Sequence, residues 1–440
     1  MAGNANQGDP RTVLEFLLRQ QPRTYDEIVR DFGRLAEQLG EDVTLSTRHL
    51  RRLASGERTS TTPVMRRVLQ ALFGKPLNEL LAPWDGGVLS AVDESTGLVL
   101  TTGKPTADKE LIEMAARRAK SFALAAGQTD LTSDVMEQVH ADVQRLATDY
   151  PQRPLSELLP DLITTQDTVF ALLEQQRRPA QARQLYFLAG ATGGLLAKAS
   201  HDLADPHAAL TQARTAFVCA DNADHDGLRA WIRGIQSLVS YWAGRTRESV
   251  RYAQSGAEFA NTNTSSVWLP MNEARAWAAL GNANAARAAI DRAEHAWDSL
   301  QEDEVDELGG LCSFGRTRQI YYAAEALSWL PSQTTITSDY AARAVDAYED
   351  SSSPEWAFGD QAGSRSALAI ARIQAGELEG ATEAVAPVLE LAPEQRINGI
   401  VHCAERVHRA LRDSPLAEAG VDLQEQIELF TRTPLKSLPR

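Results

Sequence analysis

The chain has 440 residues, 43% of them hydrophobic and 23% charged, and its 44 basic and 59 acidic residues give a net charge of −15. These proportions are typical of globular proteins, which excludes a fibrous or largely disordered chain, and the length suggests about two or three domains. The most apolar stretches, such as 184–200, are broken by Gly, Ser and Lys well before the roughly 20 apolar residues of a membrane span. The start, MAGNANQGDPRT, lacks a secretory signal pattern, so we expect a cytoplasmic protein that contacts no membrane.

The first 81 residues predict a compact bundle of short helices. After a disordered stretch over 1–10, apolar periodicity and turn residues predict helices over 13–20, 24–40, 47–54 and 63–73. Thr24 and Glu27 have the spacing of a capping box, and Ser46 is a good N-cap for the third helix. We therefore place one helical domain at 11–81.

Positive charge is concentrated in this domain. Residues 1–84 hold 12 basic and 10 acidic residues, a net of +2, whereas residues 85–440 have a net charge of −17. Residues 43–75 alone carry seven basic residues against Glu57, a net of +6. A small basic module on a large acidic body is typical of a DNA-binding head, although a solvated basic face is the plainer alternative.

The helix predicted over 47–54 has an arginine-rich face. At 100° per residue, Leu50 and Leu53 point to one side, while Arg48, Arg51 and Arg52 point to the other. A guanidinium can donate two parallel hydrogen bonds to guanine in a major groove that admits a helix, and hydroxyls and N–H groups before the next helix could hold a phosphate. We predict double-stranded DNA as the partner, contacted by Ser46, Thr47, Arg48, Arg51, Arg52, Ser55, Thr61, Arg66 and Arg67.

Residues 82–106 contain four glycines and two prolines and lack helical periodicity, which predicts a linker. Helical periodicity resumes afterwards, so a second helical domain is expected over 107–435. Within it, the acidic run 302–307 (EDEVDE) suggests a solvated loop. The predicted fold class of the whole chain is all-α.

From about residue 184 the pattern repeats as pairs of helices. Turns are predicted at Ala204, Gly244, Gly281 and Gly376, with spacings of 40 and 37 residues between the first three and room for one more pair at about 313–350. Alanines at matching positions, such as Ala286, would let the two helices approach closely. The period and these positions resemble degenerate tetratricopeptide repeats, which would form a solenoid of helix pairs. A generic Ala-rich bundle is the alternative.

Residues 11–81 resemble a helix-turn-helix module of the phage-repressor (XRE) type, with 46–54 as the recognition helix. The whole chain resembles a class of actinobacterial transcriptional regulators in which such a module precedes a degenerate tetratricopeptide domain. Its segments YFLAGATGGLLAKAS, HDGLRAWIRGIQSLVSYWAGR and EARAWAALG carry that resemblance. The resemblance implies a homodimer whose repeat domain senses a peptide, small-molecule or protein effector.

The groove of a helix-pair solenoid is its natural ligand site, because the first helix of each pair lines the inner surface. Aligning the repeats places Trp231 and Trp268 at equivalent positions. We predict effector contacts from Trp231, Tyr241, Trp268, Asn272 and Arg275. Packing between repeats is the alternative for the aromatic residues.

No motif for catalysis, a cofactor or a metal is found, so we expect no enzyme, no cofactor and no metal site. Cys219, Cys312 and Cys403 lie about 90 residues apart and form no CxxC pair, which suggests buried thiols rather than disulfides or a zinc site. The main alternative to a DNA-binding regulator is a tetratricopeptide adaptor that binds a protein partner and no DNA.

Overall fold

The computed structural model describes residues 10–20, 24–38, 43–58, 61–73, 77–82, 132–175, 178–260, 262–433 and 435. The chain divides into two compact units, Met1–Met114 and Ala115–Arg440, and each is described by itself. The described residues form helices and no β-strand, which confirms the all-α prediction. The disorder predicted over 1–10 and the linker predicted over 82–106 lie outside the described residues, except for Pro10 and Ala82.

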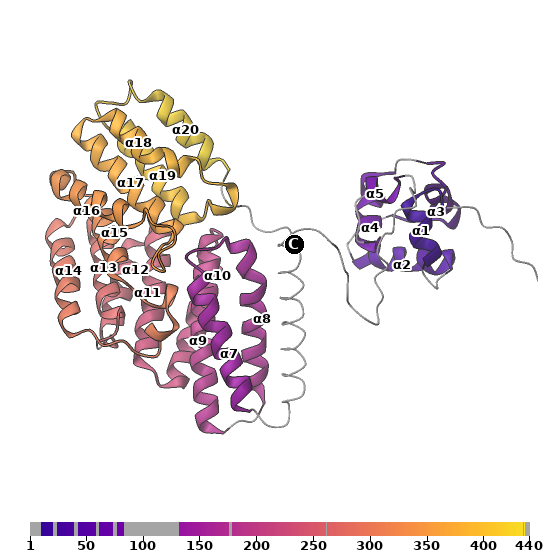
Figure 1. Ribbon diagram of the computed structural model, residues 1–440, viewed down its shortest axis with the longest axis horizontal. Helices are drawn as coiled ribbons and strands as arrows, with labels where there is room; N and C mark the ends of the chain where they lie inside the picture. The colour runs from indigo at the N-terminus through magenta and orange to yellow at the C-terminus, as the bar shows by residue number, and fades with distance from the viewer. Residues whose placement is uncertain are drawn as a thin grey trace, which may run out of the picture. The chain divides into compact units, whose positions relative to one another are not determined.

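The N-terminal unit is a bundle of short helices around one apolar core (Figure 1). Leu14, Phe32, Leu50, Val68 and Leu80 each come from a different helix and are fully buried in that core. Every one of the four predicted helices is present, and a fifth short helix follows. Its described helices are α1 (Val13–Gln20), α2 (Tyr25–Gln38), α3 (Thr47–Ala54), α4 (Pro63–Phe73) and α5 (Leu77–Leu80).

Local hydrogen bonds at the helix ends explain why these helices begin where they do. The Thr24 N–H donates to Glu27 Oε2 at 2.7 Å, and the Glu27 N–H donates back to Thr24 Oγ1 at 3.3 Å, which confirms the capping box. Ser46 Oγ accepts from the His49 N–H at 3.2 Å and caps α3. Two contacts close the unit: Thr12 Oγ1 donates to the Ala54 carbonyl at 2.6 Å, and the Val13 N–H donates to the Ala82 carbonyl at 3.1 Å.

The C-terminal unit is a stack of antiparallel helix pairs (Figure 1). The helix pair expected between about 313 and 350 is present, while the part of the domain expected over 107–131 lies outside the described residues. Its described α-helices are α7 (Ser133–Asp149), α8 (Leu155–Glu174), α9 (Pro179–Asp202), α10 (Pro206–Ala223), α11 (Asp226–Trp242), α12 (Thr246–Ala257), α13 (Ser265–Ala279), α14 (Ala283–Ala296), α15 (Arg316–Leu327), α16 (Thr334–Ala347), α17 (Phe358–Ala375), α18 (Leu378–Leu389), α19 (Asn398–Arg412) and α20 (Val421–Thr431).

All four predicted turn residues have left-handed backbone conformations. The φ angles are 61° at Ala204, 72° at Gly244, 77° at Gly281 and 83° at Gly376. Three of these positions are glycine, which adopts that conformation without the steric cost of a Cβ atom, whereas Ala204 bears that cost. The predicted turn positions are therefore confirmed, and the sequence repeat corresponds to a repeated backbone turn.

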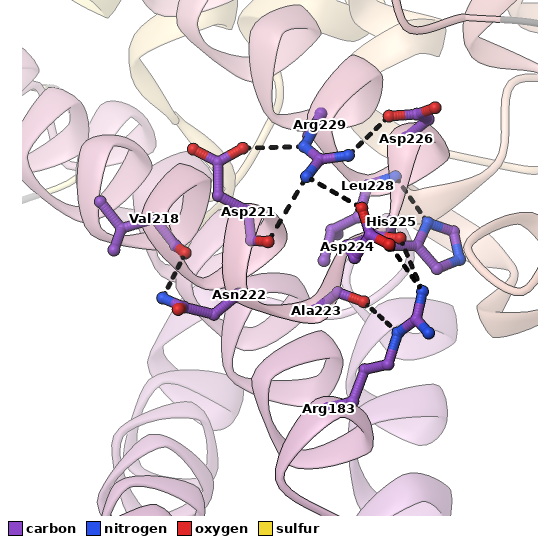
Figure 2. A network of polar contacts seen from close by, with 10 residues as sticks. All are labelled: Arg183, Val218, Asp221, Asn222, Ala223, Asp224, His225, Asp226, Leu228 and Arg229. Carbon is purple, nitrogen blue, oxygen red and sulfur yellow. Dashed lines mark hydrogen bonds and ion pairs between the residues drawn. The ribbon is translucent and has the colours of Figure 1, made fainter. Parts of the chain in front are cut away.

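The turn between α10 and α11 is held by two arginines (Figure 2). Arg183 on α9 donates to the Ala223 carbonyl at 2.7 Å, and Arg229 on α11 pairs with Asp221 at 2.8 Å and with Asp226 at 2.6 Å. Asp224, at the centre of the turn, has a φ of 49°. These contacts tie one helix pair to the next.

The first helix of each pair contacts the first helix of the next pair. In this way α9 contacts α11, α11 contacts α13, α13 contacts α15, α15 contacts α17, and α17 contacts α19. Close approach at these contacts depends on glycine. A Cβ atom on Gly194 of α9 would lie 2.1 Å from the Trp231 ring on α11, and one on Gly234 of α11 would lie 2.4 Å from the Trp268 ring on α13. Each tryptophan thus packs onto a glycine of the preceding first helix, as expected of a helix-pair solenoid.

The segment 297–315 between α14 and α15 departs from the sequence prediction. It contains the short 3-10 helices η1 (Trp297–Ser299), η2 (Asp306–Leu308) and η3 (Gly310–Cys312). Val305 and Asp306, expected in a solvated loop at 302–307, are buried, so that expectation was wrong for this part of the run. Asp306 is buried with a distant partner, because it accepts hydrogen bonds from the N–H and the hydroxyl of Thr264. A second long-range bond holds the same segment: the Trp231 indole donates to the Leu311 carbonyl at 3.2 Å.

Cys219, Cys312 and Cys403 are buried free thiols. Burial raises the pKa of Cys219 to about 11 and that of Cys403 to about 12, which keeps these thiols protonated at neutral pH. Among the helices of the described ranges, none combines the length and the apolar character that crossing a membrane requires.

Candidate functional site

Helix α3 has one buried face and one basic face, in agreement with the helical-wheel prediction. Leu50, Leu53 and Ala54 are buried against the N-terminal core, whereas Arg48, Arg51 and Arg52 are exposed. With eight residues, the helix is about 12 Å long. It presents three guanidinium groups to solvent from about two turns.

The guanidinium groups of Arg51 and Arg52 are oriented by weak local contacts. Arg51 Cζ lies 5.3 Å from the centroid of the Tyr25 ring on α2, and Arg52 Nε lies 3.6 Å from Glu57 Oε2. Both partners of the Arg52–Glu57 pair are at least half exposed, so this ion pair contributes little stability and can be exchanged for another anion. All three arginines on α3 are thus accessible to a ligand.

The remaining predicted DNA-contact residues surround α3 and the start of α4. Ser46 is exposed at the N-terminus of α3, next to the half-buried Thr47, and the half-buried Ser55 is its C-cap. Thr61 is half-buried and donates to Met65 Sδ at 2.9 Å, while Arg66 is exposed on the first turns of α4. The side chain of Arg67 lies outside what the structure describes.

His49 lies on the flank of the basic face. Partial burial, with a smaller effect of the charges of Arg58 and Arg52, lowers the pKa of His49. Since the ordinary value is already 6.5, this imidazole is neutral at neutral pH. The positive charge of α3 therefore comes from its arginines.

All five residues predicted to contact an effector are buried in the C-terminal unit. Trp231 packs on Gly194, Trp268 packs on Gly234, and the Asn272 amide donates to the Gly234 carbonyl at 3.4 Å. This placement matches the packing alternative for the aromatic pair. Effector binding by the five residues stays a prediction, and Trp268 alone among them lines a cavity identified in the described part of the unit.

Tyr241 and Arg275 belong to a buried polar network that the sequence analysis did not detect. Arg275 pairs with Glu325, which also accepts from Tyr241 Oη at 2.5 Å and from Arg406 Nη1 at 2.5 Å. Trp329 Nε1 donates to Tyr241 Oη at 2.8 Å. Although burial alone would lower the pKa of Arg275, Glu325 and nearby tyrosines raise it well above its ordinary value, so the guanidinium stays charged.

The cavity lined by Trp268 lies between first helices of the stack and has about 720 Å³ of free space, part of it open to solvent. Its walls come from the α7–α8 turn, the start of α8, α9, α11, α13, the segment 297–315, α15, the start of α17 and the residue before α19. The sequence offered no signal for it, because the lining residues are spread over more than two hundred positions.

Two partly buried ion pairs lie in the wall of this cavity. Lys198 Nζ lies 2.6 Å from both carboxylate oxygens of Asp202, whose Oδ2 also accepts from Tyr150 Oη at 2.8 Å. Arg318 Nε donates to Asp360 Oδ2 at 2.8 Å. No group of His, Cys, Asp and Glu side chains suited to a metal ion was found among the described residues.

Comparison with known proteins gave little that constrains function. No protein-family model matches the chain, and no curated protein matches it. Among solved structures, the helical fold resembles the "Crystal Structure of Rap Protein Complexed with Competence and Sporulation Factor", with 11% sequence identity and a TM-score of 0.38 over 68% of this chain and 96% of that chain. This similarity is too low to assign a family.

Proposed function

We propose that this chain is a DNA-binding transcriptional regulator of the helix-turn-helix type. In this proposal α3 is the recognition helix that enters the major groove, and the C-terminal unit is a tetratricopeptide-like domain that dimerises and senses an effector. The observation that carries the proposal is the exposure of Arg48, Arg51 and Arg52 on the face of α3 opposite the buried Leu50 and Leu53.

The chemistry of this face suits duplex DNA. A helix about 12 Å long fits the major groove, where an arginine can pair with guanine O6 and N7 through two parallel hydrogen bonds. The pair between Arg52 and Glu57 is long and exposed, so replacing Glu57 with a nucleic-acid acceptor costs little. Arg66, in the first turn of α4, is also exposed. Its guanidinium is suited to bind a DNA phosphate, and that contact would fix the position of α3 on the duplex.

A dimer would place two copies of α3 in successive major grooves about 34 Å apart. An effector in the C-terminal unit would then alter operator affinity by favouring one arrangement of the two subunits. The cavity between first helices supports such a sensor role, because its walls come from several helix pairs of the stack, so that a bound molecule would contact all of them.

The test is a gel shift of the full chain with fragments of its own genome, followed by sequencing of the retained fragments. We expect selective retention that weakens as salt rises, because cations of the protein displace counterions from the phosphates. Arg51→Glu should abolish retention while leaving the circular dichroism spectrum unchanged, since Arg51 is exposed.

Absence of retention at low salt would contradict the proposal. A stoichiometric protein partner that still copurifies with the Arg51→Glu variant, together with no DNA retention by the unsubstituted chain, would instead support the adaptor function.

A further inference from the structure

We propose that Tyr25 is a positioning residue for base reading, because its ring holds the Arg51 guanidinium of the recognition helix in place. This inference rests on the DNA-binding function proposed above and adds a residue of α2 to the specificity of α3. The observation that carries it is the contact between the two side chains. Arg51 Cζ lies over the Tyr25 ring, 5.3 Å from its centroid, which is within the roughly 6 Å reach of a cation–π interaction.

The three exposed arginines of α3 differ in what orients them. The side chain of Arg48 has no hydrogen bond, ion pair or ring contact among the described residues. Arg52 is paired through Nε with Glu57 at 3.6 Å, so this pair has to be exchanged before Nε can bind a base. Arg51 is oriented by a ring instead of an anion.

A ring contact occupies none of the hydrogen-bond donors of a guanidinium. The Arg51 side chain makes no hydrogen bond or ion pair among the described residues, and a guanidinium carries five N–H donors in one plane. All five are therefore available for guanine O6 and N7. Of the three arginines on this face, Arg51 is the one that is both oriented and free to donate.

Tyr25 is itself fixed by the N-terminal core. It is the first residue of α2, directly after the capping residue Thr24, and its half-buried side chain packs against the core. Its hydroxyl has no hydrogen bond among the described residues, so the ring alone accounts for the contact with Arg51. The core thus supports a side chain on the exposed face of another helix.

Orientation before binding matters because a flexible side chain loses rotamer freedom when it pairs with a base. Arginine carries one of the largest side-chain entropies. A ring that already restricts Arg51 in the free chain reduces this cost for the correct base pair. Nonspecific DNA contacts do not require one fixed orientation, so Tyr25 should act on discrimination more than on overall affinity.

Fluorescence anisotropy of the full chain measures this effect as the ratio of two affinities. One probe is a genomic fragment retained in the gel shift, and the other is a fragment of equal length that is not retained. Tyr25→Leu keeps an apolar side chain against the core and removes the ring. We expect it to lower the affinity ratio about two- to fivefold, which is within the cost of immobilising one flexible side chain.

Two matched variants separate the ring from general packing. Tyr25→Phe keeps the ring and should keep the affinity ratio of the unsubstituted chain. Phe73→Leu is the control, because Phe73 is also half-buried against the same core but has no ring contact with an arginine among the described residues. Its affinity ratio should be unchanged.

A double-mutant cycle shows whether Tyr25 acts through Arg51. In an Arg51→Ala background, Tyr25→Leu should lower the affinity ratio no further. In an Arg48→Ala background, Tyr25→Leu should have the same effect as in the unsubstituted chain, because Arg48 has no contact with the ring.

A measurement without DNA tests the orientation itself. In the full chain labelled with ¹⁵N-arginine, NMR relaxation reports how far each side-chain Nε–H moves on the picosecond to nanosecond scale. We expect Arg51 to be more restricted than Arg48, and Tyr25→Leu to make the two alike.

The proposal is overturned if Tyr25→Leu leaves the affinity ratio unchanged, or lowers it equally in the presence and absence of Arg51. Equal losses in Tyr25→Phe and Tyr25→Leu, or equal mobility of Arg51 and Arg48, also overturn it. In these cases the unsubstituted chain still retains DNA and the proposed regulator stands. If the unsubstituted chain retains no DNA, the proposed function fails, and the role of Tyr25 in base reading fails with it.

Discussion

Arg275 on α13 and Glu325 on α15 form an ion pair in which each side chain is only 1% exposed. Glu325 also bonds to Tyr241 on α11 and to Arg406 on α19. A single carboxylate therefore connects four first helices of the stack. Because burial removes two guanidinium groups and one carboxylate from water, the network is stable only while all of its partners are present.

Loss of the Glu325 carboxylate should destabilise the C-terminal unit strongly. Glu325→Ala leaves Arg275 buried without its anion, and we expect a cost of about 3 to 5 kcal/mol in the free energy of unfolding. Chemical denaturation followed by circular dichroism measures this cost. Asp339→Ala, which removes the 65% exposed partner of Arg343, is the control and should cost less than about 1 kcal/mol.

The sequence singled out Tyr241 and Arg275 but did not predict what they contact. Alignment of the repeats suggested both as effector contacts, and in the structure both are buried. Their partner Glu325 lies 84 and 50 residues further along the chain, in an Ala-rich helix where a glutamate looks like an ordinary surface residue. Local patterns specify the face of a helix, whereas pairing across the stack depends on tertiary contacts.

The difference between local and long-range contacts also explains why the helix starts were predicted correctly and the solvated loop at 302–307 was not. The caps at Thr24 and Ser46 depend on groups three residues away, so the sequence was sufficient to predict them. Asp306 is buried because Thr264, 42 residues earlier, donates to it. An acidic run with such a partner cannot be distinguished by composition from a solvated one.

Arginine substitutions on α3 and α4 should affect DNA binding in two different ways. We expect Arg48→Ala or Arg51→Ala to lower discrimination between operator and unrelated DNA by about 1 to 3 kcal/mol, because a base contact is lost. Arg66→Ala should weaken binding to all sequences and reduce the salt dependence, because a phosphate contact is lost. Fluorescence anisotropy at several salt concentrations measures both effects.

Arg412→Ala is the control for these DNA-binding measurements. Arg412 is 58% exposed in the C-terminal unit and pairs with the neighbouring Asp413, so its loss should change neither affinity nor salt dependence. Equal effects of Arg48→Ala and Arg412→Ala would argue against α3 as the recognition helix.

Exchanging alanine and glycine at equivalent turns should shift stability in opposite directions. Ala204 has a φ of 61°, and an L-residue in this conformation costs about 1 to 2 kcal/mol, more than the entropy that glycine loses on folding. Ala204→Gly should therefore stabilise the C-terminal unit by about 0.5 to 1 kcal/mol. Gly281→Ala, at a turn with no atom within 4 Å of the new Cβ, should destabilise it by about 1 kcal/mol through backbone strain alone. Guanidinium denaturation of both variants checks these signs, and shifts in the same direction would contradict the account.

The stability of the C-terminal unit should depend on pH through Asp306. Burial, with a smaller effect of Asp303, raises the pKa of Asp306 from its ordinary 3.8 to about 6, although hydrogen bonds from Thr264 oppose the shift. An acid whose pKa is higher in the folded state is destabilising when ionised. The destabilisation by ionised Asp306 is absent below about pH 4 and complete above about pH 6. The contribution of Asp306 to the free energy of unfolding therefore falls as pH rises through that range.

Comparison with Asp306→Asn isolates this contribution, because the amide does not titrate and other groups cancel in the difference. We expect the unsubstituted chain to lose about 1 to 3 kcal/mol relative to Asp306→Asn between about pH 4 and pH 7. Any fixed cost of placing an amide beside Thr264 shifts the whole curve and leaves the slope unchanged. Denaturant melts of both chains across the range supply the two curves. Parallel curves would show that the carboxyl group has the same pKa folded and unfolded, and that Thr264 offsets the effect of burial completely.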